Sequence, residues 1–204
     1  MKRALRLRYR KLRVLANDLE ALAALPSDTS RKFEFAWINS EGGVRQIAQV
    51  AARERFPKRV KIMQQNLAEG GRIAAALEAW EPVSWQMYRP QEQTTFRWLH
   101  LRSHDAVFVF GSYTVPAWRG HRLMTHLARF AAAAYAGQGF RRLCCVVDSN
   151  NRRSLRAHFY RGDQPVGWIA CLHLGRGPSL VASDARIACG FFNASNPFVY
   201  TVRG

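Results

Sequence analysis

The sequence predicts an α/β fold: one domain in which a central mixed, twisted sheet is flanked by helices. Its 204 residues, 48% of them hydrophobic, suffice for one buried core but not for two comfortable domains. An apolar, strand-like run at 107–115, a helical pattern after it and a second apolar run at 143–147 indicate a βαβ unit. No stretch reaches the roughly 18 apolar residues that a membrane span needs.

Residues 1–32 form a basic amphipathic N-terminal extension, in which we predict a helix over residues 4–25. Apolar residues recur at helical spacing, and basic residues occupy the other face. The apolar set is Leu5, Tyr9, Leu12, Leu15, Leu19 and Leu22, and the basic set is Lys2, Arg3, Arg6, Arg8, Arg10, Lys11 and Arg13. Pro26 ends the helix. Three uses fit: packing on the domain, lying on an anionic surface, or acting as a transit peptide.

The remaining 33–204 form the main domain, and its first part has mixed patterns. We predict a short strand at 33–39, then helices at 43–55 and 59–68 that Pro57 separates. Strands at 73–80 and 83–88 are joined by Glu81-Pro82, which suits a hairpin turn. Residues 91–104 are polar and give no clear pattern.

The second part of this domain has clearer periodicity. After the strand at 107–115, apolar residues recur with one buried helical face, and Gly137 and Gly139 end that helix. The apolar set is Leu123, Leu127, Phe130, Ala131, Ala134 and Tyr135. A strand at 143–147, a helix at 154–161 and closing strands at 166–174 and 185–192 complete the predicted order.

Cysteine and histidine usage argues against a metal site or a disulfide framework. The four cysteines form no Cys-x-x-Cys pair, and the six histidines show no His-Glu-x-x-His spacing. Adjacent Cys144 and Cys145 point to opposite faces of a strand. Buried free thiols indicate a reducing compartment, so we expect a cytoplasmic protein without a metal.

The formal net charge of +17 is the unusual feature of the composition. Such a charge attracts phosphates, RNA or anionic lipid headgroups. It is equally compatible with a proteome that is rich in arginine.

A phosphate site is suggested where the strand at 107–115 runs into the next helix. Residues 115–124 read VPAWRGHRLM. The start of a helix presents unpaired backbone N–H groups and a positive dipole end, which together bind phosphate oxygens. Gly120 allows close approach of the backbone, while Arg119 and Arg122 add guanidinium groups.

A second polar element follows the strand at 143–147. Asn151, Ser154 and His158 lie on one stripe of the predicted helix, at the end of the sheet where α/β folds bind ligands. The alternative is that Asn151 only caps the helix and His158 is a half-buried surface residue.

Together the two elements resemble the GNAT superfamily of acyl-CoA-dependent N-acyltransferases. The family's prefix Pro-x-aromatic-Arg-Gly stands at 116–120, and its Asn-x-x-Ser spacing continues to His158 and Gly162. Arg122 and Met124 depart from the small residues usual in the family. The resemblance implies a cofactor-binding set of Tyr113, Thr114, Val115, Arg119, Gly120, His121, Arg122, Leu123, Met124, Asn151 and Ser154.

The resemblance also implies a mechanism. Acetyl-CoA or another acyl-CoA is the co-substrate, and the acyl group passes directly to an amine in a ternary complex. The strands at 107–115 and 143–147 part to admit the pantetheine arm. His158 stands where a family tyrosine often protonates the departing thiolate, and Tyr160 is the weaker candidate. Asp105, Glu81, Asp148 or a water relay serves as the base.

The acceptor is left open between three readings. It is a small-molecule amine, or a polyanionic macromolecule such as aminoacyl-tRNA. The third reading is a non-catalytic GNAT-like protein that contacts a membrane surface or a partner through the basic N-terminal helix.

Overall fold

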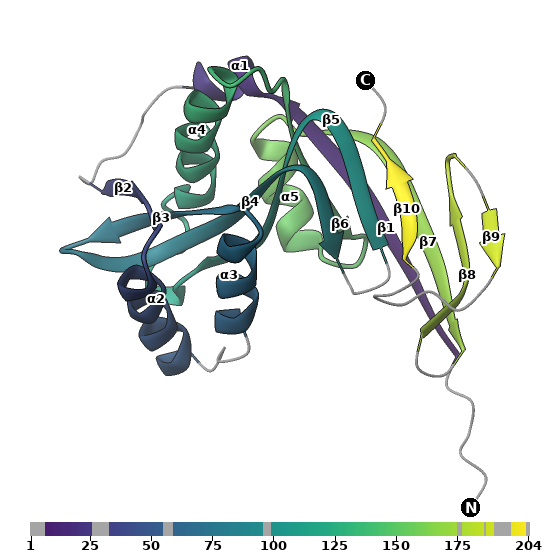
Figure 1. Ribbon diagram of the computed structural model, residues 1–204, viewed down its shortest axis with the longest axis horizontal. Coiled ribbons are helices and arrows are strands. Elements are labelled where there is room, and N and C mark those ends of the chain that lie inside the picture. The colour runs from purple at the N-terminus through teal and green to yellow at the C-terminus, as the bar shows by residue number, and fades with distance from the viewer. Residues whose placement is uncertain are drawn as a thin grey trace, which may run out of the picture. The chain divides into compact units, whose positions relative to one another are not determined.

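The computed structural model describes residues 7–25, 33–54, 59–95, 99–174, 177–185, 187–189 and 197–202 (Figure 1). The chain divides into two compact units. Unit 1 holds the described residues within Met1–Asn17, Gln91–Ala106 and Cys144–Gly204, and unit 2 holds those within Asp18–Pro90 and Val107–Leu143. Three strands run through both units: β4 (Glu81–Thr95), β5 (Leu99–Thr114) and β6 (Arg142–Asp148).

Unit 2 contains an antiparallel sheet in which β3 pairs with both β2 and β4. Its other elements are α1 (Leu19–Ala23), β2 (Glu34–Trp37), α2 (Glu41–Arg53), α3 (Arg59–Ala68), β3 (Arg72–Glu78), the 3₁₀ turn η1 (Pro116–Trp118) and α4 (Leu123–Ala136). These confirm the predicted strand, helices and hairpin. The hairpin turn was placed wrongly: it is made by Ala79 and Trp80, both at positive φ, and Glu81-Pro82 already belongs to β4.

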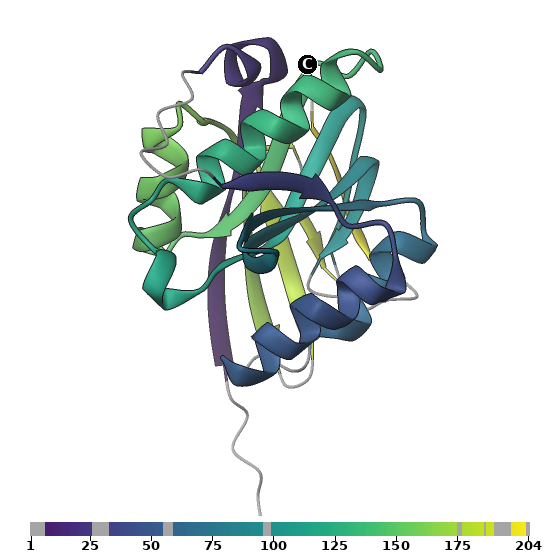
Figure 2. The same ribbon diagram turned by 90° about the vertical axis from the view of Figure 1, so that its left-hand side faces the viewer.

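Helices cover both faces of this sheet (Figures 1 and 2). On one side, Ile47 of α2 and Met63 of α3 are fully buried in a cluster with Ile73 and Trp85. On the other side lies α4, which buries Leu127, Ala131 and Tyr135. Side chains on β3 alternate between the two sides, so the fully buried Ala74 and Ala76 give α4 room to approach the sheet.

Unit 1 overturns the predicted N-terminal helix. Residues Leu7–Asp18 form strand β1, and only α1 is helical within the predicted span, of which residues 4–6 lie outside the described ranges. β1 pairs in antiparallel register with β7 (Gln164–Leu174) along almost its whole length. A bulge between Val14 and Leu15 lets both side chains be buried, which produced a helix-like spacing of apolar residues in a strand.

The remaining elements of unit 1 complete a mixed sheet. They are α5 (Arg152–Tyr160), β8 (Gly177–Ser183), β9 (Ile187–Cys189) and β10 (Phe198–Thr201). β8 pairs antiparallel with β7 and β9, whereas β10 pairs parallel with the start of β5. The predicted strand at 185–192 is therefore only β9 within the described residues. The predicted α/β class with a mixed sheet is confirmed.

Helices that could cross a membrane are absent from the described part of the chain, because none is both long and apolar enough. Among the cysteines whose side chains the structure describes, Cys144, Cys145 and Cys171 are buried thiols outside any disulfide.

Candidate functional site

The predicted phosphate turn lies in unit 2, between β5 and α4. Gly120 has φ of +89°, and a Cβ added there would meet nothing within 4 Å. Arg122 is the N-cap residue of α4, in the left-handed conformation (φ 53°), and its side chain makes no capping hydrogen bond. The amides of Thr125 and His126 donate to Arg122 O.

Among the described residues, no backbone hydrogen bond engages the amides of Leu123 and Met124. Two donors at the positive end of a 14-residue helix therefore lie beside an open glycine. Such amides cost free energy if left unpaired, and a phosphate oxygen can satisfy them.

The side chains that depart from the family pattern do not fill this turn. Met124 points toward the sheet, where its Sδ lies 3.6 Å from Ser84 Oγ. Arg122 is exposed. Arg119 is also exposed, and its Nε donates to Thr114 O over 3.2 Å. His121 packs against Trp118, with ring centroids 5.9 Å apart.

The last residues of β5, which lead into the turn, are held by packing and hydrogen bonds. Tyr113 is buried against Trp85, with ring centroids 5.0 Å apart, and its hydroxyl donates to Glu54 Oε2 over 3.1 Å. Burial, and then the bond to Glu54, raise the pKa of Tyr113. Thr114 Oγ1 lies 2.8 Å from Ser84 Oγ, and the Val115 amide donates to Val83 O. These predicted cofactor residues are thus engaged in the sheet, with their polar side chains paired.

The second predicted element lies in unit 1. Asn151 caps α5, because its Oδ1 accepts the Ser154 amide over 3.2 Å. Asn151 therefore caps the helix, as the alternative expects, and its part in cofactor binding stays a prediction. Ser154 and His158 are both half-buried, which for His158 is also what that alternative expects.

His158 belongs to a buried hydrogen-bond network that we call the Asp163 cluster: Asn17, Cys145, His158, Arg161 and Asp163. His158 Nδ1 lies 2.5 Å from Asp163 Oδ2. Arg161 donates to both oxygens of the same carboxylate, and Asn17 Nδ2 donates to Oδ1 over 2.9 Å. The carboxylate can only accept, so a proton on His158 Nδ1 would bond to it, and Nε2 lies 3.8 Å from Cys145 Sγ.

Burial alone would raise the pKa of Asp163, but the hydrogen bonds from His158 and Arg161 outweigh it and hold the pKa below its usual range. Burial raises the pKa of the neighbouring Cys145 thiol, whose Sγ lies 3.5 Å from His158 Nδ1. This thiol is therefore protonated near neutrality and is a poor nucleophile.

Cys145, His158 and Asp163 present ligand atoms within 4.8 Å of one another. The Arg161 guanidinium already occupies the carboxylate, and a second cation there would be repelled. The donor set thus suits an ion-pair network better than a metal ion.

Tyr160 lies at the end of α5 and is 67% exposed, against 16% for the His158 side chain.

Each acidic residue that was considered as the general base has a hydrogen-bond or ion-pair partner. Glu81 pairs with Arg53, Asp105 accepts from Ser103, and Asp148 Oδ2 pairs with Arg10 over 3.0 Å.

Sequence reasoning missed Arg161, Asp163 and Asn17. The first two follow His158 by three and five residues, just past the helix end, and this Arg-Gly-Asp spacing was an available signal. Asn17 lies 146 residues from Asp163 in the sequence, and no local pattern connects them.

Known structures resemble this fold at low sequence identity. A functionally unknown protein from Staphylococcus epidermidis matches at TM-score 0.59 and 10% identity, over 79% of this chain and 60% of that one. A GNAT acetyltransferase from Colwellia psychrerythraea matches at TM-score 0.56 and 13% identity, over 83% and 57%. This chain thus spans about 60% of the length of these two proteins.

A third similar structure is AAC(6′)-Iy in complex with the bisubstrate analogue CoA-S-monomethyl-acetylneamine. It matches at TM-score 0.50 and 13% identity, over 65% of this chain and 90% of that one. No curated protein matches the sequence. The family model for the acetyltransferase (GNAT) family matches residues 42–162, which is more than half of the chain and includes both predicted motifs. The chain therefore belongs to the GNAT acetyltransferase family.

Proposed function

We propose that this protein is an N-acyltransferase that uses acyl-CoA, and specifically acetyl-CoA, to acylate a small-molecule amine. The observation that carries the proposal is the start of α4, where the amides of Leu123 and Met124 have no bond among the described residues and Gly120 is open. This arrangement fits the pyrophosphate of CoA. The similar AAC(6′)-Iy structure, which holds a CoA analogue, supports the same donor.

Transfer of an acyl group from a thioester to a protonated amine needs three proton movements. The ammonium must first lose one proton, since its unperturbed pKa is near 10. The neutral nitrogen then forms a bond to the carbonyl carbon and loses a second proton as the carbon–sulfur bond breaks, and the thiolate takes up one proton. The products are an amide and the free thiol of CoA.

We assign the protonation of the thiolate to His158. Asp163 orients the ring through Nδ1, so that the protonated imidazole offers its Nε2–H as the acid. Tyr160 is more exposed than His158 and lies at the last residue of α5.

The cofactor assignment is tested with a matched pair of glycine variants. Gly120 and Gly139 stand at opposite ends of α4, have φ of +89° and +85°, and would each place a Cβ in open space. Gly120→Val should weaken CoA binding at least tenfold in isothermal titration, because the branched side chain blocks the turn. Gly139→Val carries the same backbone strain and should bind CoA as the wild type does. Equal affinities in the two variants would remove the turn as the pyrophosphate site.

The catalytic assignment is tested by release of free thiol from acetyl-CoA in the presence of an amine panel. His158→Gln should lower the rate at saturating acetyl-CoA much more than Tyr160→Phe does. If the two variants turn over equally, His158 has no part in protonating the thiolate.

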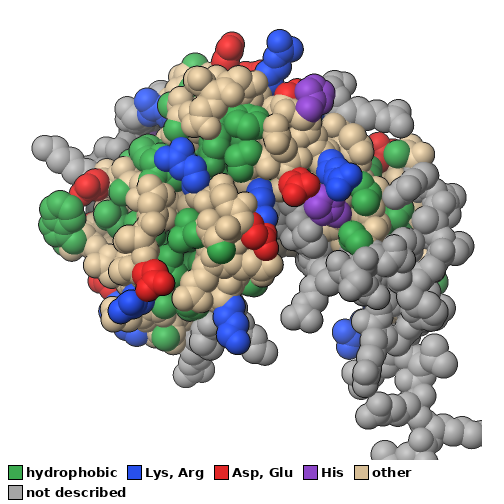
Figure 3. Space-filling model, viewed as in Figure 1, with side chains coloured by type: hydrophobic (Ala, Val, Ile, Leu, Met, Phe, Trp, Pro, Cys, Tyr) green, Lys and Arg blue, Asp and Glu red, His purple; other side chains and the backbone are tan. Residues whose placement is uncertain are grey.

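One observation favours a second candidate acceptor. The net charge of +17 suits a polyanion such as aminoacyl-tRNA. On the face shown in Figure 3, however, lysine and arginine side chains are scattered among acidic and hydrophobic ones. Binding of tRNA should weaken steeply between 50 and roughly 200 mM salt if this reading holds. The third reading needs a basic N-terminal helix, and residues Leu7–Asp18 form a strand instead.

A further inference from the structure

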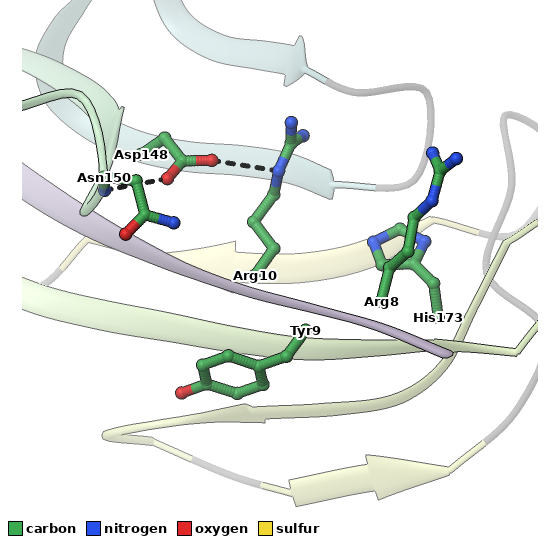
Figure 4. A pocket seen from close by; sticks show the side chains of 6 residues that line it. All are labelled: Arg8, Tyr9, Arg10, Asp148, Asn150 and His173. Atoms are coloured by element: carbon green, nitrogen blue, oxygen red, sulfur yellow. Dashed lines mark hydrogen bonds and ion pairs between the residues drawn. The ribbon is translucent and has the colours of Figure 1, made fainter. Parts of the chain in front are cut away.

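A pocket of about 450 Å³ lies in unit 1, on one face of strands β1 and β7 (Figure 4). It is lined by Arg8, Tyr9, Arg10, Asp148, Asn150 and His173. Its volume falls in the range of about 300–1,000 Å³ that is usual for small-molecule sites. None of the assignments above uses Arg8 or His173.

Strand geometry concentrates basic groups in this pocket. In the antiparallel register, Arg8 stands opposite His173 and Arg10 opposite Cys171. Side chains two apart share a face of a strand, so both arginines and His173 point to one side. Figure 4 shows Arg8 beside the ring of His173, and Tyr9 on the other side of β1.

The charges on that face are not balanced. Arg10 Nε pairs with Asp148 Oδ2 over 3.0 Å, and Asp148 Oδ1 accepts the Asn150 amide over 3.0 Å. Both oxygens of this carboxylate are therefore used. Within the described part of the chain, Arg8 has neither an ion pair nor a hydrogen bond. One cationic charge in the pocket thus lacks a counter-charge.

The surroundings of His173 lower the pKa of its ring. Burial, and then the charges of Arg10 and Arg8, lower its pKa. The ring is therefore neutral near pH 7, and its Nε2 lies 3.3 Å from Cys171 Sγ. A bound anion would offset the repulsion between the guanidinium groups of Arg8 and Arg10.

We propose that this pocket binds the oxyanion group of a small molecule, a phosphate or a carboxylate, between Arg8, Arg10 and His173. Guanidinium presents its donors as a planar fork that matches both groups in a bidentate manner. Arg8 is exposed, and a ligand in the pocket would be contacted from two strands, by the arginines of β1 and by His173 of β7.

The test is isothermal titration of the full chain, without acyl-CoA, with inorganic phosphate in one arm and acetate in the other. Ionic strength is held constant. Arg8→Gln should weaken binding about tenfold or more, the usual effect of losing a charge-assisted hydrogen-bond pair. Arg13→Gln should leave the affinity within about twofold, because Arg13 lies on the same strand but on the opposite face. The arm with the tighter binding identifies the oxyanion.

Two results would overturn the proposal. One is the absence of binding in both arms at millimolar concentration. The other is equal weakening by Arg8→Gln and Arg13→Gln, which would show general attraction by the net charge. Thermal unfolding of both variants checks that they are folded. Since the titration contains no acyl-CoA, its outcome is independent of the proposed transferase activity.

Discussion

Replacement of Asp163 by asparagine tests whether the Asp163 cluster holds unit 1 together. Asp163 and Arg161 are 1% and 3% exposed at their side chains, and the carboxylate accepts bonds from Arg161, His158 and Asn17. Asparagine has almost the same shape, so the change removes charge and one acceptor oxygen without opening a cavity. The Arg161 guanidinium is then buried without its counter-charge.

Loss of one partner from a buried ion pair costs about 3–5 kcal/mol. We expect the lower end, about 3 kcal/mol, because the asparagine Oδ1 still accepts one hydrogen bond. That is a large part of the 5–15 kcal/mol by which domains are usually stable. Urea unfolding at pH 7, followed by circular dichroism, measures the difference in midpoint and slope.

The dependence on pH gives a second readout. Since the pKa of Asp163 is lowered in the folded state, its stabilisation is present above the unfolded pKa of about 4 and is lost as pH falls below it. The gap between wild type and Asp163→Asn should therefore be constant from pH 5 to 8 and shrink on going below about pH 4.

A matched control is Glu41→Gln, which removes the exposed ion pair between Glu41 and Arg45 on α2, with side chains 84% and 76% exposed. Such pairs contribute about 0.3–0.5 kcal/mol. A loss below about 1 kcal/mol in Asp163→Asn, or a gap that does not change in acid, would refute the view that this carboxylate is the charged centre of the cluster.

Three further changes test local features of the fold by thermal or urea unfolding. Tyr135→Phe should leave stability unchanged or raise it slightly, because the buried hydroxyl has no partner among the described residues and its pKa is raised to about 12, chiefly by burial; a loss above about 1 kcal/mol would reveal a missed hydrogen bond. Gly111→Ala should destabilise by about 1–2 kcal/mol, since φ is +60° and the new Cβ would meet Met87 Cε; an unchanged midpoint would contradict the backbone assignment there. Asn151→Ala should cost about 1 kcal/mol through loss of the α5 cap, whereas Asn151→Ser should restore most of it.

Much of the fold could be predicted where short-range pattern and burial agree. The apolar run of β5, the one-sided helix α4 and the short strand β6 have strong periodicity, and the structure confirms all three. The turn between β5 and α4, which we propose to bind phosphate, could be found for the same reason. Its chemistry depends on a strand end, a glycine and a helix start, which are all local features.

The N-terminal strand could not be predicted, because its pairing partner β7 lies some 150 residues away in the sequence. Basic residues lie between the leucines, so the local pattern favours an amphipathic helix. The backbone N–H and C=O groups of an extended chain need hydrogen-bond partners, and only pairing with β7 supplies them. The bulge after Val14 then buries Leu15 as well. A regular strand alternates buried and exposed side chains, so the sequence pattern of such a strand does not predict two adjacent buried residues. β10 was missed for a related reason, since it is four residues long and pairs with the start of β5.

The sequence by itself determined the GNAT family, the α4 turn and the stripe of Asn151, Ser154 and His158, because each depends on residues close together in the chain. Only the tertiary structure decided what surrounds them. It placed Asn17 and Cys145 beside His158 and Asp163, and it aligned Arg8 with His173 across two strands. Hydrogen bonds and charges act over a few ångströms of space, and strand pairing sets that distance independently of separation along the chain.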